Sequence, residues 1–160
     1  MESAMANYGV IDLGSNSVRL VIFDVKDGIS KKKPITCKDF RSIINDKVMA
    51  GLSAYVDAGE FTPEGIARAV DVLSGHLKRA RYFNCVRTDI FATAVLRNCT
   101  NSRKAIRAIE EAIGAPVNLL SARDEAHLSF TGASCDRTIE KGTVVDLGGG
   151  STELIRVEEG

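Results

Sequence analysis

Two short segments, one near each end of the 160-residue chain, carry acidic, glycine and hydroxyl residues in the same order. The first reads DLGSNSVRL and begins at Asp12, and the second reads DLGGGSTEL and begins at Asp146. The segments align without a gap, which places Asp12 over Asp146 and Arg19 over Glu153. Because the two segments carry the same types of chemical groups in the same order, we expect both to contribute to one site.

The residue types of each segment suit phosphate binding. Glycine lets the backbone turn and bring its N–H groups close to an anion, and small hydroxyl and amide side chains add neutral donors. No GxxxxGK[ST] pattern is present, so the turns are not of the Walker type. The predicted phosphate-binding residues are Gly14, Ser15, Asn16, Ser17 and Arg19 in the first segment, and Gly148, Gly149, Gly150, Ser151 and Thr152 in the second.

The two segments differ in charge in a way that favours phosphoryl transfer. The first offers Arg19 where the second offers Glu153. Phosphoryl transfer needs a cation for the developing phosphate charge and a carboxylate for water or metal. Asp12 and Asp146 are predicted oxygen ligands for Mg²⁺ or another divalent cation, directly or through water.

The elements that must position these segments alternate between strands and helices, which predicts an α/β domain with a mixed sheet. Thr62 before Pro63 is typical of a helix start, and Ser121 with Asp124 predicts a capping box. We expect strands at residues 10–11, 18–25, 34–38, 86–92 and 117–120, a second hairpin at 142–157, helices at 62–82, 102–113 and 121–130, and irregular structure at 42–60.

Composition excludes several classes of function. Lys plus Arg and Asp plus Glu balance at 21 each, which argues against binding to DNA, and the basic residues 31–33 are predicted to be solvated. No apolar run reaches the length of a membrane span and the first residues lack signal-peptide character, so we expect a soluble, cytoplasmic protein without a membrane partner. The four cysteines show no metal-binding spacing and are expected to be free thiols.

Four segments together resemble one known family. The two repeated segments are similar to those of the superfamily that includes actin, heat-shock chaperone ATPases and sugar kinases. With residues 92–97 (ATAVLR) and 119–132 (LLSARDEAHLSFTG), they resemble the Ppx/GppA exopolyphosphatase/guanosine pentaphosphate phosphatase family. The resemblance implies a ribonuclease H-like (actin-like ATPase) lobe over residues 7–140, followed at 141–160 by the first hairpin of a second, truncated lobe.

The resemblance also implies roles for individual residues. Glu125 takes the place of the catalytic base, Thr93 and Arg97 approach the phosphate, and Asp146 and Glu153 handle the metal and the attacking water. The implied reaction is Mg²⁺-assisted attack of water on a terminal phosphoanhydride. The implied substrates are inorganic polyphosphate and guanosine pentaphosphate.

Two other functions remain open at this stage. The same turns would serve a non-hydrolytic nucleotide- or alarmone-binding module, or an ATP-dependent kinase or chaperone. Because family members carry a second lobe of comparable size, we expect this chain alone to hydrolyse weakly or not at all. The exposed edges of the second hairpin predict that it packs against the first lobe or pairs with another copy, as in a homodimer.

Overall fold

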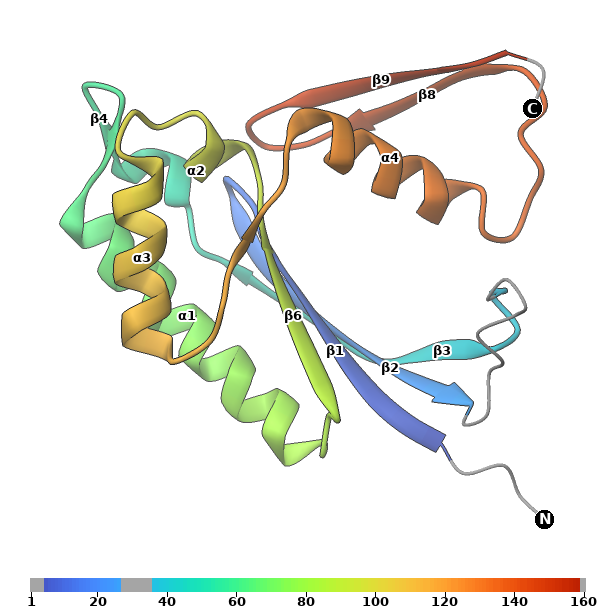
Figure 1. Ribbon diagram of the computed structural model, residues 1–160, viewed down its shortest axis with the longest axis horizontal. Helices are drawn as coiled ribbons and strands as arrows, with labels where there is room; N and C mark the ends of the chain where they lie inside the picture. The colour runs from blue at the N-terminus through green and yellow to red at the C-terminus, as the bar shows by residue number, and fades with distance from the viewer. Residues whose placement is uncertain (1–4, 27–35, 159–160) are drawn as a thin grey trace.

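The computed structural model describes residues 5–26 and 36–158, and it is built around one twisted mixed sheet (Figure 1). Five strands lie in the order β3-β2-β1-β6-β7. The first three are antiparallel neighbours, and β6 and β7 continue the sheet parallel to β1. The strands are β1 (Met5–Leu13), β2 (Ser17–Lys26), β3 (Phe40–Met49), β6 (Arg87–Ala92) and β7 (Asn118–Leu119).

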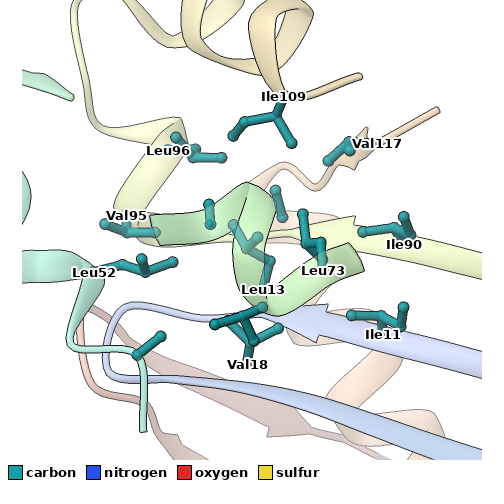
Figure 2. Close-up of a cluster of buried hydrophobic side chains, with 14 of the residues drawn as sticks. Ile11, Leu13, Val18, Leu52, Leu73, Ile90, Val95, Leu96, Ile109 and Val117 are labelled. Atoms are coloured by element: carbon teal, nitrogen blue, oxygen red, sulfur yellow. The ribbon is translucent and has the colours of Figure 1, made fainter. Parts of the chain in front are cut away.

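Two helices, α1 (Pro63–Tyr82) and α3 (Ser102–Ile113), cover one face of this sheet (Figure 1). Side chains alternate between faces along a strand. In β1, Ile11 and Leu13 therefore point into the core, where they pack with Leu73 of α1 and Ile109 of α3 (Figure 2). The same alternation turns Asp12 to the opposite face, so burial of the apolar residues orients the chemical ones.

The three predicted helix starts agree with the structure, and so do the ends of the first two helices. The Thr62 hydroxyl accepts a hydrogen bond from the Gly65 N–H at 3.2 Å, and α3 ends at Gly114, whose φ of 67° favours glycine. Ser121 caps α4 (Ala122–Ala133), which continues to Ala133 instead of ending at residue 130. None of the helices in the described ranges combines the length and apolar character needed to cross a bilayer.

The predicted third strand at 34–38 was wrong over residues 36–38, the part of it that the structure describes. Residues 36–38 form a turn, residues 31–35 lie outside the described part, and β3 occupies residues that the sequence predicted to be irregular. The sequence did not reveal β3 because Asp46 lies between Ile44 and Val48 on the face of the strand that turns toward the core. A carboxylate at that position interrupts the alternation of apolar and polar residues by which a strand is recognised. Asp46 is paired with Arg79 of α1 at 2.6 Å.

Four short elements were also not predicted from the sequence. Gly65 of α1 packs tightly on one of them, because a Cβ there would lie 2.6 Å from the Cβ of Tyr55. Such contacts depend on the tertiary arrangement and leave no periodic signal. The elements are η1 (Leu52–Tyr55), β4 (Val56–Asp57), β5 (Glu60–Phe61) and α2 (Ala94–Arg97).

The second hairpin, β8 (Gly142–Leu147) and β9 (Thr152–Val157), forms a two-stranded sheet of its own. It packs against α4, on the side of the large sheet away from α1 and α3 (Figure 1). Its other face leaves Val145, Leu147 and Leu154 exposed. The division of the chain into two lobes near residue 140, and pairing with a second copy, stay predictions.

Candidate active site

The two repeated segments fold into the same local structure. Asp12 faces Arg19 across the first hairpin, and Asp146 faces Glu153 across the second. In each turn the first glycine N–H donates to a serine carbonyl: Gly14 to Ser17 at 3.1 Å, and Gly148 to Ser151 at 3.0 Å. The repeat in the sequence is therefore a repeat in backbone geometry.

The two turns also touch each other. A Cβ added at Gly150 would lie 2.1 Å from the Ser15 hydroxyl oxygen, and one at Gly149 would lie 3.1 Å from the Asn16 Cβ. Ser15 is buried in this contact, with 5% of its surface exposed. Glycine is required here by the close approach of the turns, since neither position has a positive φ.

A cavity of about 540 Å³ opens where the turns meet. It collects most of the residues that the sequence predicted for the site. The exceptions are Arg97 and Thr152, which do not line it. The predicted residues in its lining are Asp12, Gly14, Ser15, Asn16, Ser17, Arg19, Thr93, Glu125, Asp146, Gly148, Gly149, Gly150, Ser151 and Glu153, and the others are Lys47, Met49, Ala94 and Leu147.

Carboxylates from three separate elements act on one another in this cavity. The pKa of Asp12 is raised, first by loss of water around it and next by the negative charge of Glu125, with a further contribution from Asp146. Arg19 opposes the shift. Asp12 is open to the cavity, yet the protein on either side replaces much of its hydration. A concentration of negative charge of this kind attracts a cation.

The carboxylates fit a magnesium ion that keeps part of its water shell. Within the described ranges, no three His, Cys, Asp or Glu side chains are arranged to hold a metal by themselves. Mg²⁺ is usually held by one or two carboxylates together with waters and substrate phosphate oxygens. Asp12 and Asp146 both line the cavity and are close enough for the charge of Asp146 to act on Asp12, so they are the two carboxylates that would hold such an ion.

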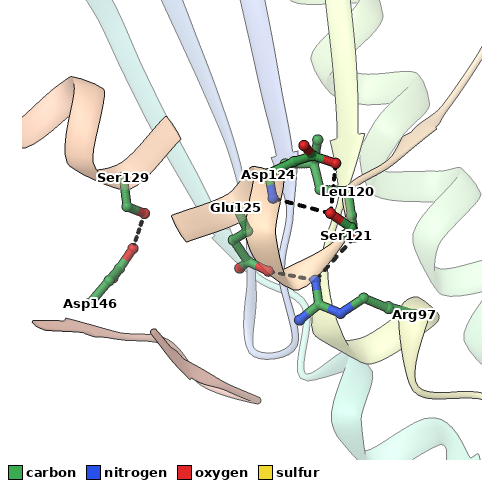
Figure 3. A network of polar contacts seen from close by, with 7 residues as sticks. All are labelled: Arg97, Leu120, Ser121, Asp124, Glu125, Ser129 and Asp146. Atoms are coloured by element: carbon green, nitrogen blue, oxygen red, sulfur yellow. Dashed lines mark hydrogen bonds and ion pairs between the residues drawn. The ribbon is translucent and has the colours of Figure 1, made fainter. Parts of the chain in front are cut away.

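Helix α4 orients carboxylates from both sides of the cavity (Figure 3). Arg97 Nη1 lies 2.6 Å from Glu125 Oε2 and donates to the Leu120 carbonyl at 3.1 Å. Arg97 thus lies behind Glu125, where it holds the carboxylate in place. One turn further along α4, the Ser129 hydroxyl donates to Asp146 Oδ2.

The cationic side of the cavity includes a residue that sequence reasoning missed. Lys47 of β3 is the strand neighbour of Arg19, on the face of the sheet that also carries Asp12. Arg19 leans toward β3 and donates to Asn45 Oδ1 at 3.4 Å, a long hydrogen bond. The exposed alternation of Asn45, Lys47 and Met49 was the available signal, and it was lost when β3 was not recognised.

We expect Asp12→Asn to stabilise the fold at neutral pH. The raised pKa means that the folded protein holds this proton more tightly than the unfolded chain does. The free energy of unfolding therefore falls as pH rises from 3.8, the ordinary pKa of an aspartate, through the higher pKa of Asp12 in the folded protein. It does not recover at higher pH. Removing the charge removes that loss.

Urea denaturation in EDTA, from pH 3 to pH 7, measures the effect. The advantage of Asp12→Asn should be present at pH 7 and should vanish at the acid end. Asp57→Asn changes an exposed carboxylate outside the cavity and is the matched control. A variant that is less stable than the parent protein at pH 7 would contradict the charge-repulsion account.

Comparison with known proteins decides the family. Residues 21–160 match the model of the Ppx/GppA phosphatase family. The chain belongs to this family. It is 30% identical over 160 residues to exopolyphosphatase 2 of Mycobacterium tuberculosis, an alignment that covers 95% of the chain and 48% of that relative. It thus spans about half the length of the curated relatives that it matches.

Solved structures of the Ppx/GppA family confirm the predicted fold class. The crystal structure of an Aquifex aeolicus family member matches with a TM-score of 0.79 at 25% identity, over 98% of this chain and 48% of that one. An exopolyphosphatase from Cytophaga hutchinsonii matches with a TM-score of 0.81 at 26% identity, over 95% and 46%. The chain has the actin-like ATPase fold, with its mixed sheet flanked by helices.

Proposed function

We propose that this chain forms part of an enzyme that hydrolyses inorganic polyphosphate, with water attacking and releasing the terminal phosphate. The observation that carries this proposal is the single cavity in which two phosphate-type turns meet, with carboxylates and cations both in its lining. A simple anion-binding site has no use for Asp12, Glu125 and Asp146 together, because three negative charges repel the ligand. A hydrolytic site uses them for water and metal.

The proposed mechanism gives each part of the cavity a task. Backbone N–H groups and hydroxyls of the two turns bind the terminal phosphate, and Arg19 and Lys47 neutralise the oxygens of the chain that leaves. Glu125, held by Arg97, accepts the proton of the attacking water. Asp12 and Asp146 would hold Mg²⁺, which supplies positive charge to the phosphate oxygens. Glu153, buried beside Asp146, adds negative charge on the metal side.

Polyphosphate is the substrate favoured by the names of the relatives, since the matched proteins from M. tuberculosis and C. hutchinsonii are called exopolyphosphatases. Guanosine pentaphosphate ends in the same phosphoanhydride and remains a second substrate within the proposal. Membership of a phosphatase family favours hydrolysis over the reaction of an ATP-dependent kinase or chaperone.

Phosphate release from both substrates, with Mg²⁺ and with EDTA, tests the proposal. It should be measured on this chain and on the chain extended through a second lobe. We expect Mg²⁺-dependent release by the extended form and little by this chain alone. Binding of polyphosphate by the extended form without release would refute hydrolysis and favour the non-hydrolytic module.

A further inference from the structure

Two cysteines that are far apart in the sequence meet in the structure. Cys37 lies in the turn before β3, and Cys135 follows the end of α4. Their sulfur atoms are 2.6 Å apart, and the Cys37 thiol also donates to the Cys135 carbonyl. At this separation the two sulfur atoms are in direct contact, and a disulfide bond of about 2.05 Å requires only a small further approach.

The environment of this pair differs from that of the other two cysteines. Cys135 is exposed and Cys37 is half-buried, so a soluble reagent reaches both. Cys99 is buried in the core and its thiol donates to the Val95 carbonyl at 3.0 Å. Burial raises the pKa of Cys99, and it is also the main cause of a raised pKa at half-buried Cys85. Cys37 and Cys135 are the two thiols that are both accessible to a reagent and in contact with each other, so the pair is the candidate reactive site.

We propose that Cys37 and Cys135 are a redox-active pair that closes to an intramolecular disulfide when a low-molecular-weight disulfide such as oxidised glutathione oxidises it. One protein thiolate attacks the oxidant, forming a mixed disulfide and releasing one glutathione thiolate. The second protein thiolate then attacks the mixed disulfide and releases the other glutathione. The two cysteines lose two electrons and two protons, and the oxidant gains them as two thiols.

The bond would tie α4 to the large sheet. Cys135 lies just after the end of α4, the helix that carries Glu125 and Ser129 and packs against β9. Cys37 belongs to the connection between β2 and β3. A cross-link between positions 98 residues apart restricts the opening of α4 away from the sheet. In the reduced protein, α4 and the second hairpin are free of that restraint.

The reaction should quicken as pH rises. The hydrogen bond with Cys37 is the first cause that raises the pKa of Cys135, and burial and the negative charges of the Cys37 thiolate and of Asp136 add to it. A backbone hydrogen bond between the two cysteines opposes the shift. Because thiolates are the attacking species, little disulfide should form in mildly acidic buffer.

Peptide mapping after oxidation tests the proposal. The reduced chain is incubated with oxidised glutathione at pH 8, blocked with N-ethylmaleimide in denaturant and digested with trypsin without reduction. We expect a peptide that ends at Lys38 to be joined to the peptide 124–137, with Cys85 and Cys99 alkylated. Dithiothreitol should restore four alkylated cysteines.

Cysteine-to-serine variants identify which cysteines form the disulfide bond. Cys37→Ser and Cys135→Ser should each leave the remaining partner as a glutathione adduct, and Cys85→Ser should form the same linked peptide as the parent protein. Hydrogen exchange should slow in α4 of the oxidised chain. The proposal is overturned if the parent protein keeps four free thiols, if Cys135 carries only glutathione, or if exchange in α4 is unchanged.

Discussion

Replacing Glu125 by glutamine is expected to lower phosphate release from polyphosphate by about 10²- to 10⁴-fold, the usual contribution of a general base. Binding of polyphosphate should be retained or slightly tightened. The amide keeps the shape of the side chain and its oxygen still accepts from Arg97, so the wall of the cavity stays in place. What is lost is the ability to take the proton of the attacking water. The rate is measured in the extended form of the chain, and binding is measured by titration calorimetry.

Asp124→Asn is the matched control for this prediction. It removes the same charge one residue away, but Asp124 faces solvent and bonds with Ser121 at the start of α4. We expect a change in rate of less than about threefold, with a small loss of stability from the weakened cap. Equal losses of rate in both variants would show that negative charge near α4 matters and that Glu125 has no specific role as base.

The sequence predicted those parts of the fold that short-range physics decides. Helix starts at Thr62 and Ser121 depend on side chains that bond within the first turn, so local spacing was enough to find them. The repeated turns were found for the same reason, because Gly14 and Gly148 serve bonds that span only three residues.

The features that escaped prediction are decided by contacts across the molecule. Pairing with β2 decides which face of β3 carries Lys47. Asp46 on the other face finds its partners on α1, where Arg79 lies 2.6 Å and His76 3.5 Å from its carboxylate. In the same way, the position of Arg97 behind Glu125 requires α2 to lie beneath α4. No spacing in the sequence encodes these distances.

The contact between the two turns leads to the prediction with the other large effect. Gly150→Ala places a methyl group 2.1 Å from the Ser15 hydroxyl oxygen and 3.0 Å from its Cβ. Ser15 is buried, and its Cβ does not move when the hydroxyl rotates, so rotation of the hydroxyl alone leaves this second contact too tight. The turns must separate, which costs about 1–3 kcal/mol for overpacking. We expect binding of tripolyphosphate, measured by calorimetry, to weaken about 10- to 100-fold.

A second substitution separates this steric cause from other effects of the mutation. Ser15→Gly removes the atoms that the new methyl group meets, so Gly150→Ala should cost little affinity in the Ser15→Gly background. Gly132→Ala, in α4 where nothing lies within 4 Å of an added Cβ, controls for the loss of a glycine. If Gly150→Ala binds tripolyphosphate as tightly as the parent protein, the two turns are not held together when phosphate is bound. If its loss persists undiminished in the Ser15→Gly background, the two residues do not interact, and the cavity is not shaped by their contact.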